Sequence, residues 1–229
     1  MAKQPRAIAP DVPHHVIQRG NRRQRTFFVD DDYIAYLELL TKHCAANEVS
    51  VWAWCLMPNH IHLVAVPKSG FGLSKAMGDT HRRFSWAINR LHQWRGSLWQ
   101  DRFRCCAMDE SHTLTAMRYV ERNPDRAHLT KRPEDWPWSS ARAHLGLPSK
   151  IPGGDQLTNL VASQSLIQDW QSFLNEELQS GQLDLLRQST GTGRPIGNPE
   201  FITGLELKLG RKLRPNKRGP LPKRLVNGG

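Results

Sequence analysis

The stretch Leu56-Met57-Pro58-Asn59-His60-Ile61-His62-Leu63-Val64 places two histidines on either side of one apolar residue, in a run that is typical of a buried strand. Alternate side chains of a strand point to the same face of a sheet, so His60 and His62 share one face while Ile61 faces the other. Two imidazoles about 7 Å apart on a rigid strand can converge on one metal ion. Such a pair can equally fill a sheet surface or hydrogen-bond a neighbour, so the pair alone leaves both interpretations open.

The segments around this stretch predict more strands and helices. Pro58-Asn59 is a turn signal, so the run before it and the run after it form an antiparallel hairpin. Apolar residues at spacings of three and four predict the helices. The expected strands are Val12–Gln18, Val49–Leu56, His60–Val66 and Leu98–Ala107, and the expected helices are Asp30–Glu48, Leu73–Trp94 and Ser111–Asn123.

The composition favours a polyanionic partner. The chain has 229 residues, a net charge of +11 and a pI of about 10.0, a balance that favours nucleic acid or an acidic membrane surface as partner. No apolar stretch reaches the roughly 18 residues that a membrane helix needs, and no secretory signal precedes the first strand, so we expect a cytoplasmic protein. The four cysteines lack CxxC spacing and are expected to be reduced and mostly buried.

Two further features are candidates for a functional site. The segment Arg19–Arg25 holds four arginines in a turn, which is either a solvated loop or a contact surface for phosphates and bases. Tyr119 and Asn123 stand four residues apart and share one face at the end of a predicted helix, because Pro124 disfavours further helix. Taken alone, Tyr119 can simply pack in the core while Asn123 caps the helix.

The last third of the chain is predicted to be an extension of the catalytic domain. Pro and Gly mark a boundary at 147–154, an apolar stripe over 167–178 predicts helix, and 190–197 resembles a flexible linker. Asn198 as N-cap, Pro199 at the first helical position and Gly210 as the stop predict one more short helix. The expected divisions are a flexible basic N-terminus over 1–11, a catalytic domain over 12–146, a helical extension over 147–190 and a basic tail over 191–229.

Several short motifs occur together and in order along the chain. They are His15-Val16, Arg19-Gly20-Asn21, Met57-Pro58-Asn59-His60-Ile61-His62, Leu98-Trp99-Gln100, Tyr119-Val120-Glu121-Arg122-Asn123-Pro124 and Trp138-Ser139-Ser140. Each motif alone is weak, but the ordered combination resembles the REP-associated tyrosine transposases, a branch of the single-tyrosine HUH transposases. The resemblance covers about residues 10–146, and the Gly193-Arg194-Pro195 to Pro220 segment is similar to an extension that many members carry.

The resemblance implies a fold and a reaction. The fold is α+β, with an antiparallel sheet flanked by helices (the ferredoxin-like HUH endonuclease fold) and a helical, basic C-terminal extension. By resemblance, His60 and His62 bind Mg²⁺ or Mn²⁺, and Tyr119 attacks the scissile phosphate of single-stranded DNA to form a covalent 5′-phosphotyrosine. Related enzymes often have glutamine as the third metal ligand. Here that position is Asn123, whose side chain is one methylene shorter than that of glutamine.

The resemblance also implies a partner and a recognition surface. The partner is single-stranded DNA that forms palindromic hairpins, and the protein is a bacterial, nucleoid-associated monomer or homodimer. The arginine turn is where members of the family read bases beside a hairpin. The expected nucleic-acid contacts are Arg19, Asn21, Arg22, Arg23, Trp99, Arg102 and Arg104, with the basic tail adding salt-dependent affinity.

Two other functions compete with this one. A DNA- or RNA-binding regulator could keep the fold without cutting, and a hydrolase could use a metal-activated water with no covalent step. Intact His60, His62 and Tyr119 argue against the regulator. Cleavage by a Tyr119→Phe variant would support the hydrolase, whereas a trapped covalent adduct would exclude both alternatives.

Overall fold

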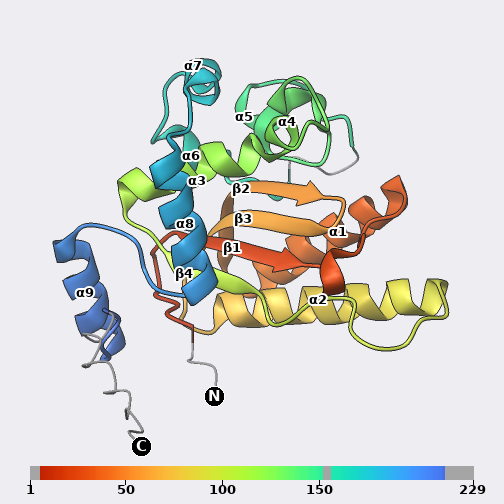
Figure 1. The fold of residues 1–229 in the computed structure, drawn as a ribbon, viewed down its shortest axis with the longest axis horizontal. Helices are drawn as coiled ribbons and strands as arrows, with labels where there is room; N and C mark the ends of the chain where they lie inside the picture. Colours follow the sequence, from red (N-terminus) through yellow and green to blue (C-terminus); the bar gives the residue numbers. More distant parts are fainter. Residues whose placement is uncertain (1–5, 152–155, 215–229) are drawn as a thin grey trace, which may run out of the picture.

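A four-stranded antiparallel sheet forms the centre of the protein, as the computed structural model shows for residues 6–151 and 156–214 (Figure 1). The histidine strand is the second in the sheet and pairs with its predecessor through the Pro58-Asn59 turn, with Met57 opposite His60. The predicted hairpin and the predicted α+β fold class are therefore confirmed. The strands are β1 (His14–Arg19), β2 (Val49–Met57), β3 (His60–Pro67) and β4 (Arg104–Ala107), in the spatial order β2-β3-β1-β4.

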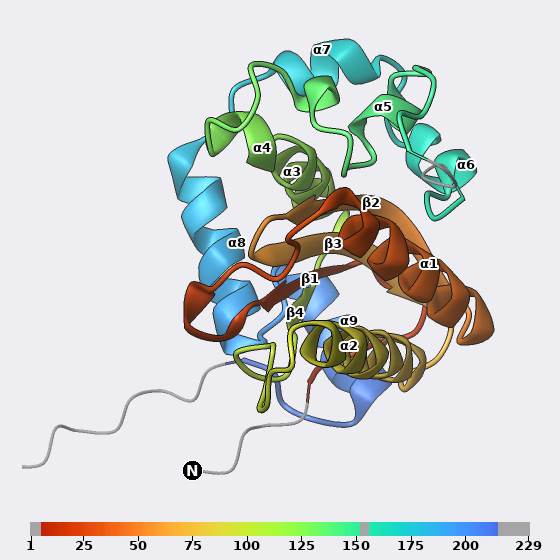
Figure 2. The ribbon, with the colours of Figure 1, turned by 90° about the vertical axis from the view of Figure 1, so that its right-hand side faces the viewer.

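The two faces of the sheet carry different helices, and the side chains of β3 alternate between them. Ile61 and Leu63 pack into the core under α1 (Asp30–Ala46) and α2 (Gly72–Leu91). Val64, on the histidine side, packs instead with residues of α3 (Glu110–Glu121) and α8 (Ser180–Thr192). Figure 2 shows α1 and α2 on one side of the strands and α8 on the other. The histidine pair therefore lies under α3 and α8.

Two predictions near the sheet differ from the structure. Of the predicted strand Leu98–Ala107 only the last four residues form β4, because Leu98 and Trp99 turn into the core and the chain loops before pairing with β1. Residues 1–5 of the expected flexible N-terminus lie outside the described residues. The part that is described does not fit that expectation, because Ala7, Ile8 and Ala9 are buried against the domain.

The C-terminal third is helical, and one of its helices has the predicted ends. Asn198 accepts a hydrogen bond from the Phe201 amide at the start of α9 (Pro199–Leu209), and Gly210 ends that helix in the left-handed region. The predicted linker over 190–197 is wrong at both ends, because Thr190 belongs to α8 and Ile196 is buried. The remaining elements are η1 (Asn21–Arg23), α4 (Asn123–Arg126), η2 (Pro133–Asp135), α5 (Ala141–His144), α6 (Leu160–Gln164) and α7 (Trp170–Asn175).

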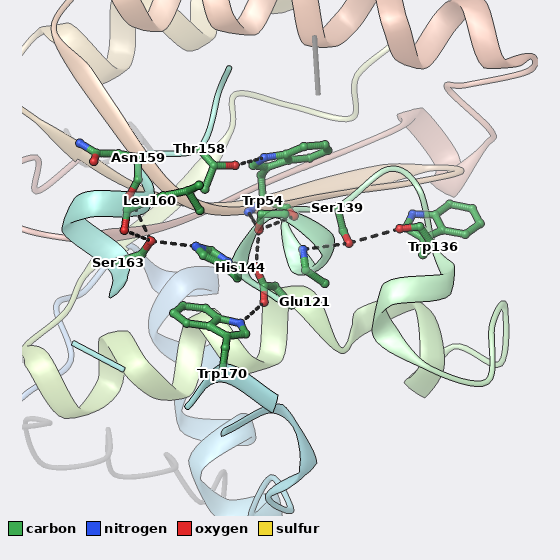
Figure 3. Close-up of polar contacts among 12 residues, drawn as sticks. Trp54, Glu121, Trp136, Ser139, His144, Thr158, Asn159, Leu160, Ser163 and Trp170 are labelled. Atoms are coloured by element: carbon green, nitrogen blue, oxygen red, sulfur yellow. Dashed lines mark hydrogen bonds and ion pairs between the residues drawn. The ribbon is translucent and has the colours of Figure 1, made fainter. Parts of the chain in front are cut away.

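A buried carboxylate attaches the extension to α3 (Figure 3). Glu121, with no exposed surface, accepts hydrogen bonds from Ser140, from His144 Nδ1 at 2.5 Å and from Trp170 Nε1 at 2.8 Å. The other ring nitrogen of His144 lies 2.8 Å from the Ser163 hydroxyl. The order Ser163-His144-Glu121 is that of a hydrolase triad, but Ser163 is fully buried, so we interpret the network as structural.

Within residues 6–151 and 156–214, no helix combines the length and hydropathy needed to span a lipid bilayer. All four cysteines are buried. Of the predicted basic tail, residues 215–229 lie outside the described residues. The described part ends with Arg211, Lys212 and Arg214.

Candidate functional site

The two histidines of β3 face α3 at the start of the strand. Their ring centroids are 5.0 Å apart and the ring planes are nearly perpendicular, at 78°. His62 is buried, whereas His60 is half-buried because it is the first residue of β3. Asn59 Oδ1 contacts Nδ1 of His60, so Nε2 is the nitrogen of this ring that can bind a ligand. His62 is therefore fixed in the core, whereas His60 is partly accessible to solvent.

Tyr119 packs directly against His62. Asp109 caps the start of α3 by accepting from the His112 amide, and ten residues later the helix presents Tyr119 to the sheet. The tyrosine ring centroid is 5.3 Å from that of His62, with an interplanar angle of 85°, and only 7% of the residue is exposed. The structure thus brings the predicted nucleophile and the predicted ligand His62 into contact.

A third histidine completes the cluster. His15 lies on the neighbouring strand β1, diagonal to His62, and its Nε2 is 3.0 Å from Nδ1 of His62. Its ring centroid is 5.9 Å from that of Tyr119. The sequence analysis used His15 only as part of a motif. Alternation along β1, together with the antiparallel register, was the available signal that His15 and His62 share a face.

Burial keeps all three imidazoles neutral. It lowers the pKa of His15 to about 3 and that of His60 to about 3, with nearby Arg19 adding to the second shift. Burial, followed by the neighbouring His60 and His15, holds the pKa of His62 well below its ordinary value. A metal ligand must be a neutral imidazole, so these environments suit ligation at neutral pH.

Arginines surround the entrance to Tyr119. A cavity of about 360 Å³ opens beside His15, His62 and Tyr119. Its basic lining consists of Arg19, Arg23, Arg102, Arg104 and Arg187. Such a cavity suits an anion of the size of a phosphodiester.

Arg187, on α8, was not predicted. Its guanidinium lies 5.7 Å from the centre of the Tyr119 ring, and hydrogen bonding to that tyrosine raises the pKa of Arg187. Arg126 lies over the same ring at 5.2 Å. No sequence signal marked Arg187, because α8 itself was not predicted as a separate helix.

The expected nucleic-acid contacts divide into three groups. Arg19, Arg23, Arg102 and Arg104 line the cavity. Arg22 is exposed on η1, and Asn21 is half-buried, with its backbone amide bonded to the Leu98 carbonyl. Trp99 is a correction: it is 5% exposed and donates its indole N–H to the His81 carbonyl, so its ring is a core component with no free face for a base.

The residues available to a divalent cation are two imidazoles and one amide. Nε2 of His62 is buried with no hydrogen-bond partner, and a bound cation would satisfy this nitrogen. Asn123 begins α4, is buried, and also has a side-chain nitrogen without a partner. In the described part of the chain no cluster of three or more His, Cys, Asp or Glu side chains could hold a metal. The two histidines of β3 therefore fit a cation whose coordination a substrate oxygen can complete, whereas the unpartnered atom of Asn123 is its amide nitrogen, which donates hydrogen bonds and does not bind a cation.

Comparison with known proteins identifies the family of the chain. The model of the family described as IS200-like transposase matches residues 10–123, a span that contains both β3 histidines, Tyr119 and Asn123. The chain belongs to this family of IS200-like transposases.

Two solved structures are similar to the chain. One is a REP-associated tyrosine transposase bound to a REP hairpin, with a TM-score of 0.55 and 19% identity, covering 68% of this chain and 93% of that one. This likeness shows a common fold. The other is a putative transposase from Deinococcus radiodurans R1, with a TM-score of 0.38 and 21% identity, covering 53% of this chain and 97% of that one. No curated protein matches the chain.

Proposed function

We propose that this transposase is a metal-dependent single-stranded DNA endonuclease and strand transferase of the REP-associated tyrosine branch. It cleaves and rejoins DNA at palindromic repeat hairpins through a covalent 5′-phosphotyrosine on Tyr119. The observation that carries the proposal is the contact of Tyr119 with His62 and Arg187 at a cavity lined by arginines. The similar fold of a REP-associated transposase bound to a REP hairpin supports the substrate class.

The reaction needs a nucleophile and a means of holding the phosphate. The phenol of Tyr119 loses its proton and its oxygen attacks phosphorus, and the bond from phosphorus to the 3′ oxygen breaks. The leaving 3′ oxygen takes up a proton to become a hydroxyl, so no net proton is released. Arg187 hydrogen-bonds Tyr119 and places a positive charge beside the oxygen that must lose its proton. The phosphotyrosine conserves the energy of the broken phosphodiester bond, so the reverse attack by a 3′ hydroxyl can rejoin a strand without another energy source.

His60 and His62 would hold the divalent metal, Mg²⁺ or Mn²⁺, and the amide of Asn123 is the third candidate ligand. When bound, such a cation polarises a phosphate oxygen and neutralises part of the charge that develops on it. Tyr119 is 7% exposed and lines the arginine-rich cavity, so a phosphate bound in that cavity would displace water from beside the nucleophile.

The basic surface continues past the cavity. A second cavity of about 590 Å³ shares Arg102 and Arg104 with the first and extends to Arg194 and Lys212. All four of these side chains are exposed. We propose that a single strand follows this surface by its phosphates, since a basic groove can hold a strand without reading its sequence.

The test is an adduct assay on a denaturing gel. Wild-type protein is mixed with single-stranded palindromic repeats from DNA flanking its gene, with Mg²⁺ or Mn²⁺. Tyr119→Phe is the test variant and Tyr33→Phe the matched control, because Tyr33 is buried in the opposite core. We expect an SDS-resistant band for the wild type and for Tyr33→Phe, and none for Tyr119→Phe.

The other outcomes identify the competing functions. Cleavage by Tyr119→Phe would point to a water-using hydrolase. Binding of several repeats without adduct or cleavage, with either metal, would point to a regulator that retains the fold but does not cut.

A further inference from the structure

Helix α8 of the extension contributes a hydrogen-bond chain that ends at the candidate metal site. The chain begins at Thr190, which is 3% exposed. Its hydroxyl donates to the Leu186 carbonyl at 2.8 Å, one turn earlier in the same helix. A hydroxyl has one proton, so towards its other neighbours the Thr190 oxygen can only accept.

His15 is the next member of the chain. Its Nδ1 lies 2.7 Å from the Thr190 oxygen, and this nitrogen must therefore carry the proton that is donated. The sulfur of Cys106 is 3.2 Å from the same oxygen, and its buried thiol can supply the second donated proton. A neutral imidazole carries only one proton, so Nε2 of His15 is left with a lone pair.

That lone pair determines which nitrogen of His62 is protonated. Nε2 of His15 is 3.0 Å from Nδ1 of His62, and the two ring planes differ by only 8° with centroids 5.2 Å apart. In this arrangement the N–H of His62 points at the lone pair of His15. Nδ1 of His62 is then the protonated nitrogen, and its buried Nε2, which has no partner, carries a free lone pair.

We propose that Thr190, acting through His15, fixes the tautomer and the ring orientation of His62 so that Nε2 is presented to a divalent cation. Thr190 and His15 are positioning residues, and α8 is in this sense part of the site. The inference rests on the proposed function insofar as His62 is a metal ligand. The reverse chain, with Thr190 donating to His15, would place a proton on Nε2 of His62 and block ligation.

The test compares three threonine variants in the full-length protein. Thr190→Val keeps the shape of the side chain and removes the oxygen, whereas Thr190→Ser keeps the hydroxyl. Thr192→Val is the matched control, because Thr192 makes the same bond to the carbonyl one turn earlier, at Gln188, but is exposed and does not contact His15. Thermal unfolding shows that each variant is folded.

Two measurements are made on each variant without DNA. Nitrogen-15 NMR of the histidine rings reports the tautomer of His62 in the metal-free protein, and electron paramagnetic resonance reports the affinity for Mn²⁺. We expect the Nδ1–H tautomer in wild type, Thr190→Ser and Thr192→Val, and its loss in Thr190→Val. Mn²⁺ affinity should fall by about 10- to 100-fold in Thr190→Val only, as is typical when a partner of a ligating histidine is removed.

The outcomes separate this inference from the proposed function. An Nε2–H tautomer of His62 in the wild type, or unchanged tautomer and Mn²⁺ affinity in Thr190→Val, would overturn the inference. A wild type that shows the expected tautomer but binds no Mn²⁺ would contradict the metal site itself. The hydrogen-bond chain would then still be supported by loss of the tautomer in Thr190→Val.

Discussion

Replacing Glu121 by glutamine tests whether the buried network attaches the extension to α3. Three donors converge on this carboxylate: Trp170 Nε1 contacts Oε2, while Ser140 Oγ and His144 Nδ1 contact Oε1. Glutamine has the same shape but replaces one oxygen by an NH₂ group, which donates. If the amide nitrogen takes the place of Oε2, it faces the indole N–H of Trp170, which can only donate. If it takes the place of Oε1, Ser140 and His144 must both change from donors to acceptors.

The size of the effect follows from these contacts. An unsatisfied buried donor costs about 1–3 kcal/mol, and more when its lost partner is a charged group such as a carboxylate. We therefore expect Glu121→Gln to lose about 2–4 kcal/mol of unfolding free energy. For a chain of this size that loss lowers the melting temperature by roughly 5–15 °C.

The assay is thermal unfolding followed by circular dichroism, with Glu177→Gln as control. Glu177 is exposed in the loop after α7, so its replacement should change the unfolding free energy by less than about 0.5 kcal/mol. If the melting temperature of Glu121→Gln lay within 2 °C of the wild type, taken as roughly 1 kcal/mol or less, the network would not hold the extension in place.

Three further predictions concern charge at the site and in the core. Arg187→Gln should reduce covalent adduct formation on the order of 100-fold, as measured on the denaturing gel, because the positive charge beside the reacting oxygen is lost. Arg187→Lys should recover part of the yield, and full yield from the glutamine variant would remove Arg187 from the reaction. Arg104→Gln should reduce the slope of log affinity for single-stranded DNA against log salt concentration by about 0.7. The control is Arg95→Gln, because Arg95 is exposed and lies away from the cavity, so the slope should stay unchanged. Equal slopes for the wild type and Arg104→Gln would exclude Arg104 from phosphate contact. Burial lowers the pKa of His14 to about 4 and that of His81 to about 3, so the unfolded chain binds more protons than the folded chain from these values up to pH 6.5. The free energy of unfolding should therefore fall as the pH is lowered through this window, by about 1.4 kcal/mol per pH unit for each histidine. Urea unfolding at pH 7.5 and at pH 5 measures this loss. Equal unfolding free energies at the two pH values would contradict the conclusion that both histidines are buried and neutral.

Local patterns were sufficient for much of the fold. Alternation along the strand after Pro58 predicted which side chains of β3 share a face, and Ile61 and His62 do lie on opposite faces. The ends of α9 could be predicted from Asn198 and Gly210, because helix capping depends only on the few residues at each end of a helix.

The features that sequence reasoning missed depend on long-range packing. Thr190 and Arg187 are separated by more than 60 residues from Tyr119, and only the docking of α8 on the sheet brings them to it. Trp99 was expected at the nucleic-acid surface because of the family resemblance. Trp99 is buried against α2 because packing there removes its large apolar surface from water, and the local sequence does not show which distant residues it will contact.

The most direct test of the central claim is mass spectrometry of the trapped adduct. The protein is incubated with a hairpin strand and Mn²⁺, digested with trypsin and nuclease, and searched for a nucleotide-linked peptide. We predict a peptide in which Tyr119 carries the 5′ phosphate of the downstream fragment, while the upstream fragment ends in a free 3′ hydroxyl. Cleavage products with no linked peptide, or a linkage on any other residue, would contradict the account.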